Sequence, residues 1–468
     1  MDIKLAFWGA ARNVTGSRYL LEVGDNRLLV DCGLYQEREY RARNWDTFPV
    51  SPQSIDAVLL THSHIDHCGL LPKLVRDGFK GKIYCVEASA DIAEIMLMDS
   101  ARLQTEDAEF KRRRHEREGR KGPFPEIPLY TVGDAESTIP LLSPVRYKEQ
   151  VTLGDGIQAI FHNAGHVFGS SMIEVTISQG GDTRRLLFSG DVGRRNMPII
   201  KDPSFFEEAD YIIVESTYGD RLHESPTDIG HILGEVVHST IQAGGNIIIP
   251  SFALERAQEV LFYLSRLLGE GDIPHLMVFL DSPMAINITE VFKNHPGLYD
   301  REMKGLVSDG DSPFEYPGLV MTRTADESKA LNRLRGTSII IAGSGMCTGG
   351  RIKHHLVSNI SRRESTIMFV GYQAIGTLGR QIVEGAKKVR ILGQKYNVRA
   401  RITQIQGFSA HADKNELFDW LTVLKRPPRH VFVTHGEPEV IQVFSDYIRE
   451  KTGWGVSAPE YGHGVRLE

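Results

Sequence analysis

The sequence lacks the features that mark secreted, membrane-spanning and fibrous chains. It has no run of about 18 apolar residues, so a membrane-spanning helix is not expected. Its N-terminus carries no basic, apolar leader and is predicted to be a first strand. Its 468 residues contain four scattered cysteines without a CxxC pair: Cys32, Cys68, Cys85 and Cys347. A disulfide framework is therefore not expected, and a cytoplasmic location is favoured.

An excess of positive charge is also missing, because the formal net charge is −6. A nucleic-acid partner would therefore have to be bound by local basic patches. One cluster, Lys111–Arg114, is diluted by Glu116 and Glu118. A second run has no acidic residue between Glu384 and Asp413 and comprises Lys387, Lys388, Arg390, Lys395, Arg399 and Arg401. Such runs are more often solvated faces than binding sites, and both interpretations stay open here.

Short apolar runs separated by turn residues dominate the first part of the chain. Residues 3–9, 17–24, 27–33 and 55–61 are predicted to be strands. A short helix is expected at 69–76. A long exposed helix, with Ser89 as its N-cap, is expected to run into the charged stretch 104–121.

The middle of the chain has a different pattern. A helix is expected at about 227–243, and from there to residue 384 apolar strands such as GNIIIPSF and STIMFVGY alternate with helices. This alternation predicts a parallel sheet with crossover helices. Residues 398–405 and 429–436 return to a β-rich pattern. The fold class is therefore α/β, a β-rich fold interrupted by an inserted α/β domain.

The strongest motif is the run THSHIDH at 61–67. It places His62, His64, Asp66 and His67 within six residues, directly after an apolar strand. Imidazole nitrogens and carboxylate oxygens are ligands that zinc binds readily, and a catalytic zinc keeps one position open for water. The competing interpretation, a surface histidine cluster, is weak because the sequence supplies further ligands elsewhere.

Three such ligands each follow a predicted strand. They are His166 in NAGH, Asp191 in FSGD and His435 in VTHG. A carboxylate at Asp191 could bridge two metals about 3.5–4 Å apart. Each of these residues alone would more often be structural, so the argument depends on the set.

Together these residues resemble the signature of the metallo-β-lactamase superfamily. The resemblance implies two β-sheets between helices, with the site at the sheet edge. It also implies two Zn²⁺ ions per chain, one held by His62, His64 and His166, the other by Asp66, His67 and His435, with Asp191 bridging them. Asp31, in VDCG, would orient a ligand histidine; the alternative is a turn aspartate before Gly33.

Further motifs narrow the resemblance to the β-CASP nucleases of this superfamily. These are ESTYG at 215–219, GFSAHAD at 407–413 and VTHGE at 433–437, together with the inserted α/β domain. The likeness is to the RNA-cleaving branch, which includes the endonuclease of the cleavage and polyadenylation specificity factor. The implied domains are a metallo-β-lactamase domain at 1–208 and 389–468 and a β-CASP domain at 209–388.

The resemblance implies a zinc-dependent endoribonuclease for RNA processing or decay. Two zincs could generate hydroxide near neutral pH for attack on a phosphodiester. His411 would protonate the leaving oxygen, Glu215 would keep it protonated, and Asp66 could orient the attacking water. Without the resemblance, His411 would be a residue beside a helix N-cap and Glu215 a turn acid.

Glycine-rich loops add candidate substrate contacts. Small residues at 344–351 and 376–380 would let backbone N–H groups approach phosphates, although such loops are equally common as tight turns. The candidate substrate-binding residues are Arg256, Ser344, Gly345, Gly349, Gly350, Arg351 and Arg380.

Several alternatives stay open. A 5′-to-3′ exoribonuclease usually carries a further C-terminal domain, DNA-repair relatives lack a histidine where His435 stands, and non-catalytic RNA-binding homologues have lost metal ligands that are present here. The expected partner is RNA, no membrane is expected, and a homodimer stays open. Manganese or iron could replace zinc, because nitrogen and oxygen ligands accept them as well.

Overall fold

The computed structural model describes residues 1–120, 125–223, 229–334, 336–374, 376–405 and 407–468. These form two compact units. Unit 1 comprises Met1–Arg195, Asp202–Leu222 and His411–Glu468, and unit 2 comprises Asn196–Lys201 and His223–Ala410. The α/β class with an inserted domain is thereby confirmed.

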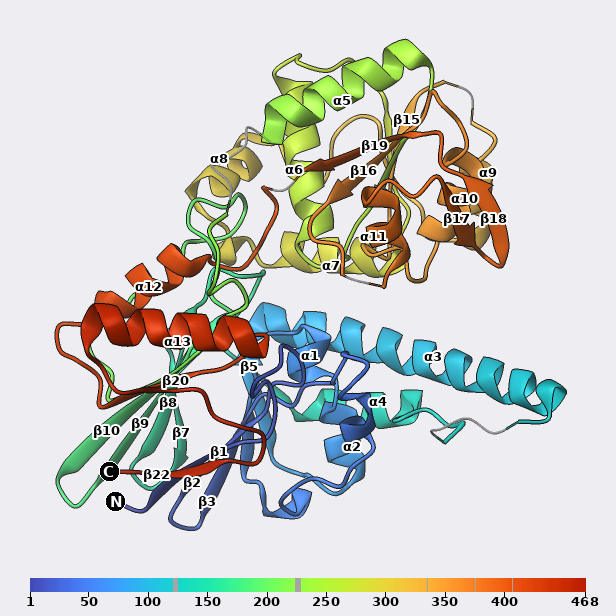
Figure 1. Cartoon of the computed structure of the whole chain (residues 1–468). Helices are drawn as coiled ribbons and strands as arrows, with labels where there is room; N and C mark the ends of the chain where they lie inside the picture. Colours follow the sequence, from blue (N-terminus) through green and yellow to red (C-terminus); the bar gives the residue numbers. More distant parts are fainter. Residues whose placement is uncertain (121–124, 224–228, 335, 375, 406) are drawn as a thin grey trace. The chain divides into compact units, whose positions relative to one another are not determined.

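Unit 1 is built on two sheets that have seven strands each in the described part of the chain (Figure 1). The first has the order β22 (Gly464–Leu467), β1 (Ile3–Phe7), β2 (Tyr19–Val23), β3 (Asn26–Val30), β4 (Ala57–Leu59), β5 (Lys82–Val86) and β6 (Leu142–Val145). The second has the order β21 (Val456–Ser457), β20 (His430–Val433), β11 (Tyr211–Val214), β10 (Asp182–Phe188), β9 (Ser171–Gln179), β8 (Ile157–Asn163) and β7 (Gln150–Gly154). The N-terminal and C-terminal strands pair antiparallel, which brings both ends of the chain to one edge.

The inner faces of the two sheets pack on each other. The ring of Phe7 on β1 lies 5.2 Å from that of Phe432 on β20, and Tyr19 on β2 lies 6.2 Å from Phe188 on β10. Helices cover both outer faces, with apolar cores between helix and sheet. On the first sheet these are α1 (Ile65–Cys68), α2 (Leu71–Arg76), α3 (Glu87–Glu118) and α4 (Val132–Thr138); on the second they are α12 (Lys414–Thr422) and α13 (Pro438–Thr452).

Unit 2 contains a sheet whose six described strands are all parallel. Their order is β14 (Leu319–Met321), β13 (Met277–Leu280), β15 (Ser338–Ala342), β12 (Ile247–Pro250), β16 (Thr366–Val370) and β19 (Arg401–Ile405). An antiparallel pair, β17 (Lys388–Ile391) and β18 (Gln394–Asn397), lies apart from it. The helices are α5 (Ile229–Ala243), α6 (Arg256–Gly269), α7 (Pro283–Asn294), α8 (Arg301–Asp309), α9 (Ala325–Leu331), α10 (Ile352–Asn359) and α11 (Leu378–Val383).

Most sequence-based elements are confirmed within a few residues, but two expectations are wrong. The long helix α3 begins at Glu87, and Ser89 lies inside it, where its hydroxyl donates to the carbonyl of Gly169 (2.7 Å) instead of capping. The strand at 398–405 was assigned to the closing part of the β-rich fold. It pairs instead with β16, so unit 2 extends beyond residue 388. The start of the helix expected at 227 and residue 121 of the charged stretch lie outside the described residues.

Candidate metal centre

Sheet topology gathers the motif residues of unit 1 at one edge. Strands β10, β11 and β20 are mutually parallel neighbours, so the residues after their carboxyl ends lie together. Asp191, Glu215 and His435 follow these three strands. On the other sheet, β4 ends at Leu59, His62 and His64 lie in the following loop, and Asp66 and His67 sit on the one-turn helix α1.

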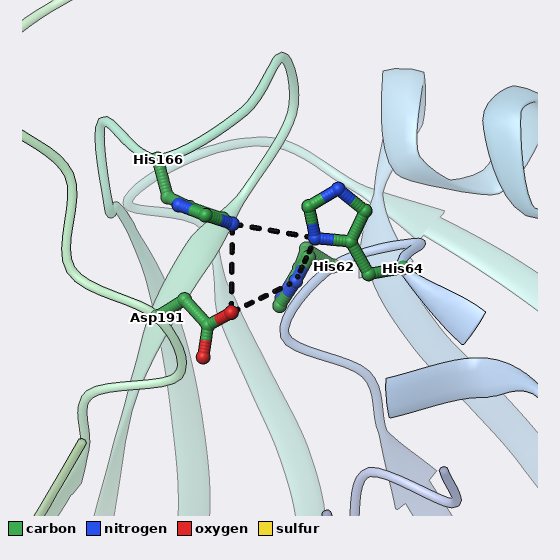
Figure 2. Close-up of side chains that lie close together, drawn as sticks. All are labelled: His62, His64, His166 and Asp191. Atoms are coloured by element: carbon green, nitrogen blue, oxygen red, sulfur yellow. Dashed lines mark hydrogen bonds and ion pairs between the residues drawn. The ribbon is translucent and has the colours of Figure 1, made fainter. Parts of the chain in front are cut away.

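One group of side chains surrounds a single point (Figure 2). Nδ1 of His64 lies 3.0 Å from Nε2 of His62 and 3.3 Å from Nε2 of His166. Oδ2 of Asp191 lies 3.5 Å from the His62 nitrogen and 3.4 Å from the His166 nitrogen. Three nitrogens and one oxygen therefore converge, a donor set suited to zinc.

A second group converges on the other oxygen of the same carboxylate. Nε2 of His67 and Nε2 of His435 lie 3.1 Å apart, and they are 3.4 and 3.6 Å from Oδ1 of Asp191. Oδ2 of Asp66 lies 4.0 and 3.7 Å from these two nitrogens. Asp191 thus presents one oxygen to each group, the arrangement of a carboxylate that bridges two metals.

The charges of the buried groups fit two cations. Burial lowers the pKa of His64 to about 4, so its ring is neutral and available as a ligand at neutral pH. Burial would also lower the pKa of His67, but the carboxylates of Asp191 and Asp31 outweigh it and raise that pKa. Oδ1 of Asp191 is buried and accepts no hydrogen bond from the described residues. The carboxylates therefore favour positive charge at a place where Oδ1 of Asp191 has no hydrogen-bond donor among the described residues. A bound metal ion would supply that charge.

Side chains behind the ligands fix the orientation of the rings. Asp31 accepts from Nδ1 of His67 (2.7 Å) and from the backbone N–H of Thr61 (2.8 Å). The hydroxyl of Thr61 lies 3.1 Å from Nδ1 of His62, and that of Thr217 lies 3.2 Å from Nδ1 of His435. These contacts leave each Nε2 directed at the centre. Thr61 and Thr217 are not among the predicted site residues, although both lie inside the motifs THSHIDH and ESTYG.

Close backbone packing holds the α1 turn against the loop after β3. A Cβ on Gly33 would lie 1.6 Å from the carbonyl oxygen of Asp66, so only glycine fits there. Asp31 and His435 both adopt positive φ values, 60° and 51°, which side chains rarely adopt outside functional sites. The ligand positions therefore depend on local backbone conformations that the flanking strands impose.

A histidine–glutamate pair lies beside the centre. Nδ1 of His411 is 3.0 Å from Oε1 of Glu215, and its Nε2 is 4.0 Å from Oδ2 of Asp191. Burial by itself would lower the pKa of His411, but Glu215 outweighs it and raises the pKa to about 9. The side chains of His411 and Asp66 are 21% and 19% exposed, whereas those of the ligands His62, His67, His166, Asp191 and His435 are at most 4% exposed. These two residues mark the open side of the centre.

The candidate substrate-binding residues lie in unit 2 and have partners there. Arg351 donates to Asp281 (2.6 Å) and to the carbonyl oxygens of Thr322 and Arg323 (3.0 and 2.8 Å). Arg380 pairs with Glu384 at 2.7 Å. A phosphate role for these two arginines stays a prediction that would require them to exchange partners.

The remaining candidates form tight local contacts. Arg256 pairs with Glu259 and is largely buried. In the glycine-rich loop, the Ser344 hydroxyl accepts from the N–H groups of Thr348 (3.0 Å) and Gly349 (3.2 Å). A Cβ on Gly345 would lie 2.7 Å from the Phe252 ring, and one on Gly350 would lie 2.4 Å from the Gly343 carbonyl oxygen. Close backbone packing accounts for these two glycines whether or not a phosphate binds.

Two facing sheets, helices on both outer faces, and a ligand cluster at the sheet edge define the metallo-β-lactamase class of metal-dependent hydrolases. Family models agree: the metallo-beta-lactamase superfamily matches residues 12–231, the Beta-Casp domain 257–382, and the Zn-dependent metallo-hydrolase RNA specificity domain 395–459. Among the described residues, no helix is both long and apolar enough to cross a membrane.

Known relatives carry the comparison further. The chain is 37% identical to a ribonuclease of Thermus thermophilus, covering 99% of this chain and 100% of that protein. It is 30% identical to the transcription termination factor FttA of Methanocaldococcus jannaschii (96% and 69% covered) and to an RNase J-like protein of the same organism (93% and 93%). The chain therefore belongs to the β-CASP ribonuclease family of metallo-hydrolases. A solved structure from Enterococcus faecalis, of unknown function, has the same fold, with a TM-score of 0.57 at 11% identity over both whole chains.

Proposed function

We propose that the chain is an endoribonuclease that hydrolyses RNA phosphodiester bonds with two zinc ions. The observation that carries the proposal is the placement of Asp191, whose two oxygens face two separate ligand groups beside the His411–Glu215 pair. His62, His64 and His166 would hold one ion, Asp66, His67 and His435 the other, and Asp191 both. Two bound ions would supply an acidified water and offset the charge that develops on the phosphate.

The protein's own groups account for the proton transfers. A water oxygen forms the new bond to phosphorus, and Asp66, which is partly exposed at the open side, orients that water and accepts its proton. The bond from phosphorus to the 3′ oxygen breaks, and protonated His411 donates its proton to that oxygen. Glu215 keeps His411 charged until transfer. The products carry a 5′-phosphate and a 3′-hydroxyl.

The relatives support RNA as the substrate and leave the cleavage mode to experiment. The Thermus relative is named a ribonuclease and another relative is named RNase J-like, and 5′-to-3′ exonucleolytic cleavage is the second candidate mode. A histidine at 435 with carboxylate and imidazole neighbours argues against the DNA-repair alternative, and the full ligand set argues against a non-catalytic homologue. Four buried free thiols fit a cytoplasmic location, and homodimerisation stays a prediction.

Circular RNA tests the proposal, because a circle has no end for an exonuclease. Zinc-loaded protein is incubated with circular RNA and with end-labelled linear RNA, alongside His64→Ala and a matched His463→Ala control. His463 is exposed and lies outside the ligand groups. We expect the wild type and the control to open the circle and His64→Ala to leave it intact. If wild-type protein holds two zincs but cuts neither RNA, the proposal that RNA is the substrate is wrong. If the circle survives while linear RNA shortens from its 5′ end, the result supports the exonuclease alternative.

A further inference from the structure

The hairpin formed by β17 and β18 in unit 2 has two chemically different faces. Its register pairs Lys388 with Asn397 and Arg390 with Lys395, and pairs Val389 with Tyr396 between them. Because directly opposed residues share a face, the first two pairs lie on one side and the third on the other. All four residues of the first side are exposed.

The opposite face fixes the hairpin to the core of unit 2. Val389 and Ile391 are buried in a cluster with Ile352 and Leu356 of α10. The N–H of Val398 donates to the carbonyl of Lys387 (2.9 Å), which ties the two strands together at their open end. The cationic face is thus presented on a fixed support and is not a mobile tail.

No acid in the described residues neutralises this cationic face. None of Lys387, Lys388, Arg390, Lys395 and Arg399 forms an ion pair with a described carboxylate. On α3 the pattern is different, because Lys111 pairs with Asp107, Arg113 with Glu109 and Arg114 with Glu118. Like charges directly opposite each other, as at Arg390 and Lys395, destabilise a hairpin. A local destabilisation of this kind is typical of a functional site.

We propose that the exposed face of the β17–β18 hairpin binds the phosphodiester backbone of single-stranded RNA. The inference deepens the proposed function and rests on RNA being the substrate. A fixed cationic face without paired acids fits a polyanionic partner. The face is positively charged although the net charge of the chain is −6. Tyr396, the aromatic residue of the hairpin, lies on the opposite side by register, so the exposed face offers phosphate contacts and no stacking platform.

Phosphate contacts have a measurable salt dependence. For single strands, the logarithm of the binding constant falls with the logarithm of salt concentration by about 0.7 for each phosphate neutralised. A triple variant, Lys388→Gln with Arg390→Gln and Lys395→Gln, should therefore reduce this slope by about 2 if each side chain neutralises one phosphate. At about 0.1 M salt each lost contact corresponds to about a fivefold weaker affinity, and three to about a hundredfold.

The experiment measures fluorescence anisotropy of a labelled single-stranded RNA over a salt series. Every protein compared also carries His64→Ala, which we expect to block cleavage, and a gel confirms that the RNA stays intact. The matched control carries Lys111→Gln, Arg113→Gln and Arg114→Gln on α3, whose charges are already paired. A Lys388→Arg variant keeps the charge. Vesicles of phosphatidylserine and phosphatidylcholine form a separate arm. Thermal melting checks that every variant is folded.

We expect the hairpin variant to lose affinity and slope for RNA, and the control and Lys388→Arg to bind as the wild type does. Wild-type affinity and slope in the hairpin variant overturn the proposal, as does an equal loss in the α3 control. Loss of vesicle binding with unchanged RNA binding overturns it in favour of a membrane surface. Because binding is measured without cleavage, a protein that binds RNA through the hairpin but cuts none refutes the proposed function alone.

Discussion

Replacing Asp31 by Asn tests whether metal binding by the second ligand group requires the proton of His67 to stay on Nδ1. Nε2 of His67 faces the centre, so Nδ1 carries the proton and donates it to Asp31 at 2.7 Å. Asp31 also accepts from the N–H and the hydroxyl of Thr61 (2.8 and 2.9 Å). A carboxylate accepts all of these hydrogen bonds, and an amide cannot.

The asparagine has two orientations, and both disturb the site. With its oxygen toward the Thr61 N–H, its amide group donates to Nδ1 of His67 and moves the ring proton to Nε2. That proton then occupies the lone pair directed at the centre, where His435 and Asp191 converge. With the amide reversed, its NH₂ group opposes the N–H of Thr61 and a buried donor loses its acceptor.

The expected loss is larger for one of the two metals. Changes of this kind behind a ligand reduce metal affinity by about 10- to 100-fold, equivalent to about 1.4–2.7 kcal/mol. Of the ligands of the first ion, only His62 is linked to Asp31 by hydrogen bonds among the described residues, and only through the hydroxyl of Thr61, so the first ion should lose less affinity than the second. The two binding steps should therefore lie further apart in the variant than in the wild type.

Zinc titration against a competing chelator measures both steps. The control is Asp25→Asn, since Asp25 is exposed in the turn between β2 and β3. RNA cleavage should fall with the weaker step and recover at high zinc. If Asp31→Asn binds both ions with wild-type affinity, or loses both equally, the assignment of Asp31 to His67 and the division into two ligand groups are refuted.

Three further predictions follow from the same contacts. Glu215→Gln removes the largest of the carboxylate contributions that raise the pKa of His411 to about 9, so that pKa falls and the alkaline limb of the pH–rate profile moves to lower pH; cleavage at neutral pH should fall by about 10²- to 10⁴-fold with unchanged zinc content, and an unchanged profile would exclude His411 as the acid. In unit 2, burial opposes ionisation of Asp281, but hydrogen bonds from His355, Ser328 and Arg351 lower its pKa; its stabilisation is present above the ordinary carboxyl pKa and is lost as the pH falls through the folded value, so in urea unfolding Asp281→Asn should show less acid destabilisation than the wild type. Chelating the zinc should lower the melting temperature, because ions bound at about 100 times their dissociation constant contribute about 2.7 kcal/mol to folding, and returning zinc should restore it; a melting temperature indifferent to zinc would contradict the metal centre.

Several groups at the centre could be predicted from the sequence because they are polar residues that follow an apolar strand. Parallel neighbours bring such positions to one edge, and β10, β11 and β20 do so for Asp191, Glu215 and His435. The contacts that orient the ligand rings could not be predicted in the same way. The roles of Thr61 and Thr217 depend on which ring nitrogen faces inward, which no sequence spacing specifies.

Strand pairing was predictable only in part. The run at 398–405 has the alternating pattern of a strand, and the structure contains that strand as β19. The pattern does not state its partner, however, and β16 supplies an open parallel edge that β19 completes. Ser89 shows the same limit: a serine near a helix start is a frequent N-cap, but here Ser89 lies inside α3 and its hydroxyl donates to the carbonyl of Gly169.

Arg351 shows that a sequence motif and a tertiary contact can indicate different roles for the same side chain. Arg351 follows a glycine-rich loop, which the sequence alone interprets equally well as a phosphate-binding loop or as a tight turn. In the fold its guanidinium bonds Asp281, which also accepts from His355 (2.6 Å) and Ser328. A cation already held by a buried carboxylate positions the loop more than it attracts a phosphate. The cations of the β17–β18 hairpin, by contrast, form no ion pair with a described carboxylate, and the sequence left open whether their run is a solvated face or a binding site. Replacing Arg390 should therefore reduce RNA affinity more than replacing Arg351 does.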